Sequence, residues 1–188
     1  MGIDLEKKKP FDLTKREPGL RNIIAGLGWD ANIVNGEGID CDVSVFMLGE
    51  NGKIPGEDFF VFFNQLKSED GSVIHLGDNL NGAGEGDDES IEIDLSKVSQ
   101  KVVQILFTVT IHKAEERGHH FGLVNNAFIR IYNKNNNSEL CRFTLTDQFN
   151  GMDSVLIGRL YSDGVEWKFE AMGDAFGGGL ETLLELYN

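Results

Sequence analysis

The longest strand pattern in the chain, at residues 102–111, limits the possible folds more than any other feature. Apolar residues alternate along it, so five of them share one face of an extended strand: Val103, Ile105, Phe107, Val109 and Ile111. The opposite face carries both apolar and polar residues, among them Gln104 and Thr108. A strand with one fully apolar face and one mixed face is typical of a sheet that packs against a second sheet.

Shorter β-prone runs joined by turn residues account for most of the remaining chain. The runs at 155–161 and 165–171 flank Ser162-Asp163-Gly164, and Asp-Gly is a strong hairpin signal because both residues tolerate positive φ. The runs at 127–132 and 139–145 flank an Asn-rich turn and predict a second hairpin. Further strands are expected at residues 43–48, 59–63, 72–76 and 91–94, with the aromatic run at 59–63 in the core.

Helical patterns are short and few. Leu180, Leu183, Leu184 and Tyr187 recur at helical spacing and predict a short amphipathic helix at the C-terminus. A helical turn is also expected at residues 114–118. No internal repeat or linker divides the chain. The predicted fold is therefore all-β: an antiparallel β-sandwich of two sheets with a short C-terminal helix, forming a single domain over residues 1–188.

The composition excludes several classes of protein. Hydrophobic residues make up 40% of the 188 residues and thirteen are Phe, which is enough to build a core. The formal net charge of −14 argues against nucleic-acid binding, which depends on Lys and Arg, and against docking on an anionic membrane. No apolar run approaches the roughly 20 residues of a membrane span, and no apolar signal segment precedes the acidic body. We therefore expect no nucleic-acid partner, no integral membrane segment and a cytoplasmic location.

The cysteines and histidines point to packing roles. Two cysteines, Cys41 and Cys141, without a CxxC spacing exclude a cysteine zinc cluster and suit a reducing cytoplasm, although a single disulfide stays open. Cys41 is expected to be buried and unreactive, because the flanking Asp40 and Asp42 raise the pKa of its thiol. The adjacent histidines at 119–120 lack a third ligand, and the other two histidines are expected to be packing or polar-face residues.

An acidic, glycine-rich loop at residues 78–89 is the main candidate for a functional site. No Lys or Arg occurs between Lys67 and Lys97, yet nine acids do: Glu69, Asp70, Asp78, Glu85, Asp87, Asp88, Glu89, Glu92 and Asp94. Crowding so many like charges is costly unless a cation is bound. Carboxylates, carboxamides and backbone carbonyls are the ligands that Ca²⁺ prefers, whereas Zn²⁺ favours nitrogen and sulfur. Calcium is thus the predicted ion, with Mg²⁺ as an alternative.

The loop matches neither of two common glycine-containing motifs. Its length equals that of an EF-hand loop, but Leu80 and Gly82 stand where that motif needs oxygen ligands, and Ala83 replaces its glycine. It also lacks the lysine of a phosphate-binding loop, and its acids would repel a phosphate.

A second acidic group precedes the strand at 43–48. Asp40 and Asp42 lie two residues apart, so their carboxylates share one face of an extended chain. The pair is placed to project from the end of the sheet toward the glycine-rich loop, which would make the metal site a product of the folded sandwich.

Several of these motifs, in this order, resemble the TerD family of bacterial tellurium-resistance and stress-response proteins. They are Gly26-Leu-Gly-Trp-Asp30, Asp40-x-Asp42, Gly77-Asp-Asn-Leu-Asn-Gly-x-Gly-x-Gly-Asp-Asp-Glu89, Asp94-Leu95 and Asn126-Ala-Phe-Ile-Arg130. The resemblance implies a cytoplasmic β-sandwich with two neighbouring calcium sites. The metal motif of the family falls on Asp40, Asp42, Asp78, Asn79, Gly82, Gly84, Glu85, Asp87, Asp88 and Glu89. Asn81 departs from the family, which often has Thr there.

The patterns together with the resemblance suggest three functions, and the link to tellurium resistance and stress response comes from the resemblance. The first is a non-catalytic calcium-binding protein that acts as an interaction scaffold for protein partners in a tellurium-resistance or stress-response system. The second is a calcium-dependent module that binds a ligand or a membrane. A metal-assisted hydrolase is the least favoured, because no candidate base or nucleophile stands apart from the predicted ligands.

Overall fold

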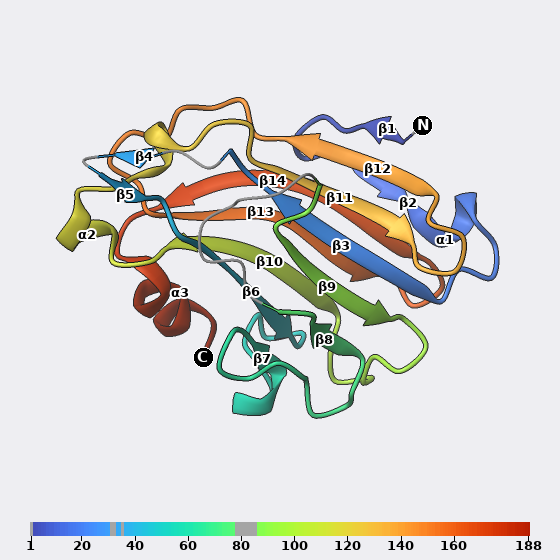
Figure 1. The fold of residues 1–188 in the computed structure, drawn as a ribbon. Coiled ribbons are helices and arrows are strands. Elements are labelled where there is room, and N and C mark those ends of the chain that lie inside the picture. The colour runs from blue at the N-terminus through green and yellow to red at the C-terminus, as the bar shows by residue number, and fades with distance from the viewer. Residues whose placement is uncertain (1, 31–32, 35, 78–85) are drawn as a thin grey trace.

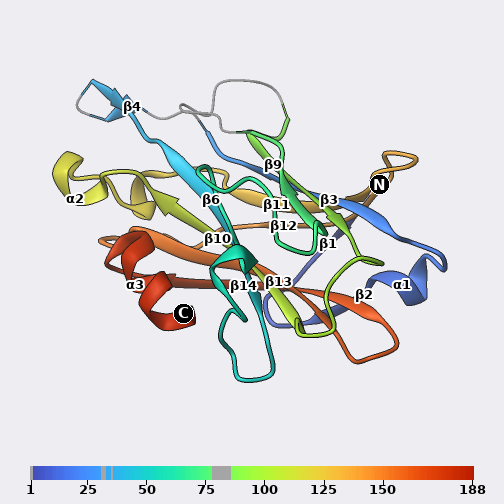
Figure 2. The same cartoon turned by 90° about the horizontal axis from the view of Figure 1, so that it is seen from below.

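A computed structural model describes residues 2–30, 33–34, 36–77 and 86–188 of the chain. Two six-stranded sheets, A and B, lie face to face (Figures 1 and 2). Sheet A has the order β1 (Ile3–Asp4), β12 (Glu139–Thr144), β11 (Phe128–Asn133), β3 (Asn22–Gly28), β9 (Glu89–Asp94), β8 (Val73–His75). Sheet B has the order β2 (Pro10–Asp12), β14 (Trp167–Phe176), β13 (Ser154–Ser162), β10 (Gln104–Ile111), β6 (Cys41–Leu48), β7 (Phe60–Val61). The predicted sandwich is confirmed.

The smaller elements lie at the ends and outer faces of the sandwich. A short hairpin is formed by β4 (Ile33–Val34) and β5 (Glu37–Gly38). The helical elements are α1 (Leu13–Arg16), η1 (Glu57–Phe59), α2 (Ala114–Arg117), η2 (Phe121–Leu123) and α3 (Gly179–Tyr187). The strand pairs among the described residues are antiparallel except that β1 runs parallel to β12, so sheet A is mixed.

Strand β10 behaves as its alternation predicts. Ile105, Phe107, Val109 and Ile111 are buried in the main core between the sheets. The two predicted hairpins are also present, as β11–β12 and β13–β14. In the second hairpin Gly164 has φ of 93°, a conformation that few other residues adopt without strain.

Helix α3 covers part of the outer face of sheet B (Figure 2). Leu183 is fully buried in a second apolar cluster with residues that sheet B directs away from the main core: Phe46, Leu48, Phe60, Leu106 and Leu156. The predicted C-terminal helix is thus confirmed, and its apolar stripe explains why these strands are apolar on both faces. With nine residues, α3 is the longest helix in the described part of the chain, and none found there has the length and hydropathy to cross a membrane.

The aromatic run at 59–63 differs from the prediction of one continuous strand. Only Phe60–Val61 form β7, after the 3-10 turn η1, and the chain then reverses at residues 62–65. Phe62 stacks on Phe60 with ring centroids 4.6 Å apart, whereas Phe63 is 38% exposed. β7 lies at the edge of sheet B, where no other strand of the described residues pairs with its outer side.

The N-terminal segment joins the two sheets along one side of the sandwich (Figure 1). It pairs first with β12 of sheet A and then with β14 of sheet B. Between these pairings, Lys7 donates hydrogen bonds to Asp147 and to the carbonyl oxygen of Gly173, and Lys8 lies 2.9 Å from Asp174. Basic residues near the N-terminus are therefore paired with acids of the folded body.

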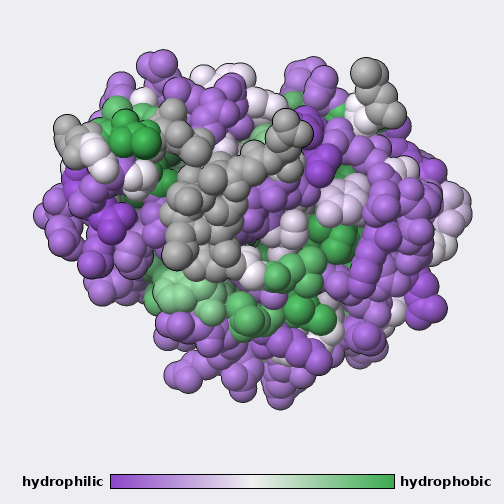
Figure 3. Space-filling view, viewed as in Figure 1, coloured by the Kyte–Doolittle hydropathy of each residue, from purple (hydrophilic) through white to green (hydrophobic). Residues whose placement is uncertain are grey.

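The outer surface is mainly hydrophilic on the face shown in Figure 3, as the net charge leads one to expect. An apolar area lies on this face near β7 and β8. Leu66 and Leu76, which precede and follow β8, are 47% and 54% exposed.

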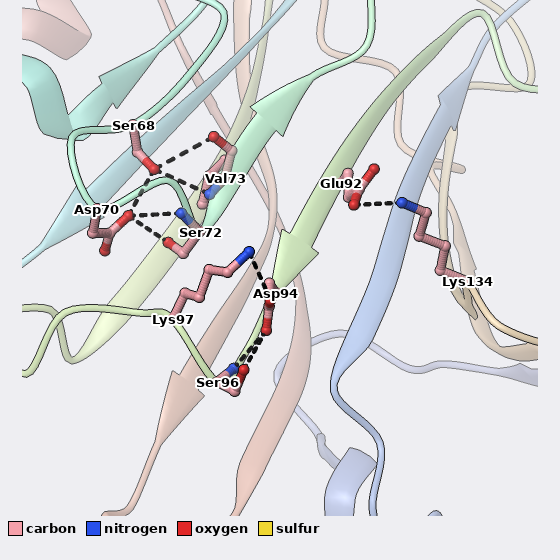
Figure 4. A network of polar contacts seen from close by, with 9 residues as sticks. All are labelled: Ser68, Asp70, Ser72, Val73, Glu92, Asp94, Ser96, Lys97 and Lys134. Carbon is pink, nitrogen blue, oxygen red and sulfur yellow. Dashed lines mark hydrogen bonds and ion pairs between the residues drawn. The ribbon is translucent and has the colours of Figure 1, made fainter.

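Asp70 is the centre of a hydrogen-bond network next to β8 (Figure 4). Its Oδ1 accepts from the Ser68 hydroxyl at 2.8 Å and from the backbone N–H and hydroxyl of Ser72 at 2.9 and 2.7 Å. Its Oδ2 accepts from the N–H of Ser99 at 2.8 Å. Burial raises the pKa of Asp70, but the hydrogen bonds from Ser72, Ser99 and Ser68 outweigh it, so the pKa lies below its ordinary value.

We expect Asp70→Ala to lower the free energy of unfolding by about 1–3 kcal/mol at pH 7, because Ser68 and Ser72 are buried and lose their acceptor. The pKa of an unfolded Asp is about 3.9, and folding lowers the pKa of Asp70. The Asp70 carboxylate therefore stabilises the fold at pH values above about 3.9, and this stabilisation is lost as the pH falls through the pKa of the folded state. Urea unfolding at pH 7 and below pH 4 measures the free energy of unfolding. The difference in this free energy between wild type and Asp70→Ala should become smaller in acid. The exposed neighbour Glu69→Ala is the control, and an equal loss there contradicts the assignment.

Candidate metal centre

The predicted ligands divide into two groups. Asp40, Asp42, Asp87, Asp88 and Glu89 are among the described residues. The remaining members of the predicted set, Asp78, Asn79, Gly82, Gly84 and Glu85, lie outside the described residues. The described members of the set lie at the start of β6 and in the segment that leads into β9.

Asp40 and Asp42 flank the start of β6 on the face opposite to Cys41. Cys41 points into the main core with no exposed surface, so strand alternation places its neighbours on the other side. Asp42 is nevertheless buried, and its Oδ2 lies 3.8 Å from Nδ1 of His112 at the end of β10.

Glu89 joins the two sheets. It is the first residue of β9 in sheet A, and its Oε2 accepts a hydrogen bond of 2.9 Å from the N–H of Val43 in sheet B. β7 pairs with β6 only at Val45 and Phe46, so the N–H of Val43 lies beyond the end of that pairing. The buried Glu89 carboxylate therefore takes the place of a neighbouring strand at this edge.

His75 accompanies Glu89 in the interior. Its Nε2 lies 3.2 Å from Oε2 of Glu89, and both side chains are 1% exposed. Its Nδ1 accepts from the N–H of Gly77 at 3.2 Å, which leaves Nε2 to carry the proton in the neutral ring. The sequence offered no sign of this pairing beyond a histidine in a strand, because the partners meet only through the β8–β9 ladder.

Asp88 is held against the end of β3. Its N–H donates to the carbonyl oxygen of Leu27 at 2.7 Å, and its Oδ2 accepts from the N–H of Trp29 at 2.8 Å. Burial raises the pKa of Asp88; the Trp29 bond opposes this, while the charges of Asp87 and Asp30 add to it. This carboxylate thus lies in a negative environment, which favours a bound cation.

Several of these acids affect the pKa of the Cys41 thiol. Burial raises its pKa well above the ordinary value, and the charges of four carboxylates raise it further: Asp40, Asp42, Glu89 and Asp88. Two of them come from the β6 end of sheet B, and two come from the segment at the start of β9 in sheet A. Both cysteines are buried and free, and burial raises the pKa of Cys141 to about 12.

Asp87 has a different environment. Its Oδ1 accepts from Nε of Arg130 at 2.7 Å and its Oδ2 from Nη2 at 3.0 Å. Glu92 pairs with Lys134 through one oxygen, with Nζ and Oε1 2.5 Å apart. The region between Lys67 and Lys97 contains no cation of its own, but β11 and the residue after it place two cations against it. The sequence motif 126–130 contained Arg130 without indicating this role.

The donor set fits a hard cation. Asp40, Asp42, Asp88 and Glu89 carry the oxygen donors that Ca²⁺ prefers. Within the described ranges, no three His, Cys, Asp or Glu side chains are arranged to hold a metal ion by themselves.

The fold and this site define a class: an all-β sandwich whose acidic end is built from both sheets. The TerD domain family matches residues 1–187, and the chain belongs to that family. It is 44% identical over 187 residues to tellurium resistance protein TerD of Serratia marcescens, covering 100% of this chain and 97% of that protein. It is 46% identical over 188 residues to general stress protein 16U of Bacillus subtilis (strain 168), covering 100% of this chain and 97% of that protein.

A solved structure supports the fold. A homologue of the telluride resistance protein TerD from Streptomyces coelicolor A3(2) superposes with a TM-score of 0.68 at 18% identity, covering 88% of this chain and 96% of that one. The chain is thus a member of the TerD tellurium-resistance and stress-response proteins.

Proposed function

We propose that this chain is a non-catalytic calcium-binding protein of a bacterial tellurium-resistance and stress-response system. Its role would be that of a cytoplasmic interaction scaffold with protein partners in that system. The observation that supports calcium binding is that Glu89 of β9 accepts a hydrogen bond from the N–H of Val43 in β6, next to Asp42, so that acids of both sheets lie at the start of β6. The names of the relatives support the system, and two buried, free thiols suit the cytoplasm.

The chemistry favours calcium over other ions. Asp40, Asp42, Asp88 and Glu89 offer only hard oxygen donors, which disfavours zinc. Magnesium requires near-octahedral geometry and keeps its waters, whereas calcium accepts six to eight oxygens in an adaptable arrangement. We propose two adjacent calcium sites, to which residues 78–85 contribute further oxygen atoms.

Binding would hold the ends of the two sheets together. The carboxylates come from sheet strands that are far apart along the chain, so an ion between them binds the folded state and not the unfolded chain. Such binding stabilises the fold by RT ln(1 + [Ca²⁺]/Kd). A calcium-loaded end of this kind gives a partner protein a surface whose charge and shape depend on the ion.

Calcium is expected to raise the free energy of unfolding by about 2.7 kcal/mol at a hundredfold excess over Kd. Thermal unfolding in EDTA and in millimolar calcium measures the effect, and calorimetric titration counts the ions. An unchanged melting temperature in calcium contradicts the proposal.

Matched variants locate the site. Asp42→Asn and Asp88→Asn, from the two sheets, should each lower calcium affinity by about tenfold or more, since each removes one charged ligand. Glu6→Gln changes the net charge equally on an exposed N-terminal residue and should leave affinity unchanged. Equal effects in all three variants would place the binding elsewhere.

A further inference from the structure

We infer that Asp87 is an anchoring residue bound to Arg130 and not a calcium ligand, and that Arg130 positions the acidic residues that follow Asp87. The calcium part of this inference rests on the proposed function, whereas the anchor itself rests on contacts in the described structure. Asp87 thus has a different role from Asp88 and Glu89, the neighbouring residues in the predicted ligand set.

One guanidinium group holds both oxygens of the Asp87 carboxylate. Both of its oxygens accept from Arg130, at 2.7 and 3.0 Å, and the side chain is 7% exposed. A bidentate pair of this kind is both strong and directional. The hydrogen bonds to Asp87 raise the pKa of Arg130 above its ordinary value, which agrees with a tight pair.

The space for this pair is provided by Gly26. Gly26 lies opposite Arg130 in the β3–β11 ladder, and a Cβ atom at this position would overlap the Asp87 carboxylate. The carboxylate thus lies directly over the backbone of β3. Arg130 is itself held from the other side by Glu139 of β12, with Nη1 and Oε2 3.3 Å apart.

Anchoring Asp87 determines where the next two residues lie. Asp88 then bonds through its N–H to Leu27 of β3 and through its carboxylate to Trp29, just after β3. Glu89 begins β9 and reaches the N–H of Val43 in the other sheet. A displaced Asp87 would move both of these carboxylates away from the Asp40–Asp42 end of β6.

The rival hypothesis is that Asp87 leaves Arg130 to bind calcium. Arg130 would then compete with the ion, and its removal would strengthen calcium binding. If Asp87 is an anchor, removal of Arg130 disorders the approach to the site and weakens binding. The two hypotheses therefore predict effects of opposite sign.

Lys134 supplies a matched control for the loss of a positive charge. It follows β11 and pairs with Glu92, which lies three residues after Glu89 in β9, and it does not contact Asp87 in any hydrogen bond or ion pair of the described residues. Removing it tests the general electrostatic effect, which strengthens cation binding at a nearby acidic site.

The experiment is calorimetric calcium titration of the full chain with Arg130→Gln and Lys134→Gln. We expect Arg130→Gln to weaken calcium binding by about tenfold, because a small misplacement of ligands is enough to lower affinity strongly. Lys134→Gln should leave affinity equal or stronger. Stronger binding in Arg130→Gln, or equal changes in both variants, would overturn the inference.

Melting in EDTA tests the anchor without calcium. Asp87→Asn, Arg130→Gln and Gly26→Ala should each lower the melting temperature by about 5 °C, and Asp87→Asn combined with Arg130→Gln should cost less than the two separate losses added together. Additive losses would overturn the anchor. If wild type binds no calcium, the proposed function fails while these melts still decide the role of Asp87.

Discussion

Replacing Glu89 with alanine is expected to lower the free energy of unfolding by about 3 kcal/mol in the absence of calcium, because a buried carboxylate that serves both sheets is lost. The N–H of Val43 loses its acceptor, and Nε2 of the buried His75 loses a neighbour at 3.2 Å. Leaving buried polar groups without partners costs more than the hydrogen bonds themselves contribute. Urea unfolding in EDTA measures the change.

Glu92→Ala is the matched control for this prediction. Glu92 lies on the same strand, but its carboxylate is part of a half-exposed pair with Lys134 on the outer face of sheet A. Such pairs contribute about 1 kcal/mol or less. Equal losses in the two variants would mean that Glu89 does not join the sheets.

Leu183→Ala is the second large effect, with an expected loss of about 3 kcal/mol. Leu183 is fully buried where α3 packs on sheet B, next to Phe46 and Leu156. A helix of nine residues is not stable by itself, so its order depends on this contact. Without Leu183, α3 should detach before the sandwich unfolds.

Urea unfolding and limited proteolysis of the C-terminus measure this together. Leu186→Ala removes the same side chain from a position that is 47% exposed, and should cost about 0.5 kcal/mol or less. If Leu183→Ala leaves both stability and protease resistance at the level of Leu186→Ala, the packing of α3 does not stabilise the fold.

Most of the fold class could be predicted from local patterns. The alternation at 102–111, the Asp-Gly turn before Val165 and the helical spacing of Leu180 to Tyr187 each act between residues that are close along the chain. The aromatic run at 59–63 was partly wrong as a strand, because strand length at a sheet edge depends on neighbours that the run does not contain. The parallel pairing of β1 could not be predicted for the same reason.

The candidate site shows the same division. The acidic residues were evident from composition and spacing, and calcium stays a prediction made from them. The counter-cation Arg130 and the partner His75 were not evident. Neither has a local sequence signal, because an arginine or histidine in a strand is compatible with many neighbours.

By itself, the sequence determined the period of each strand, the turns, the amphipathic helix and the acidity of residues 78–89, since these depend on residues near one another along the chain. Only the tertiary structure decided how each acid is used. Glu89 meets Val43 of the other sheet across 46 positions, and Asp87 meets Arg130 of the same sheet across 43. Residues near each acid in the sequence therefore do not distinguish a carboxylate that joins the sheets from one that is held by a guanidinium.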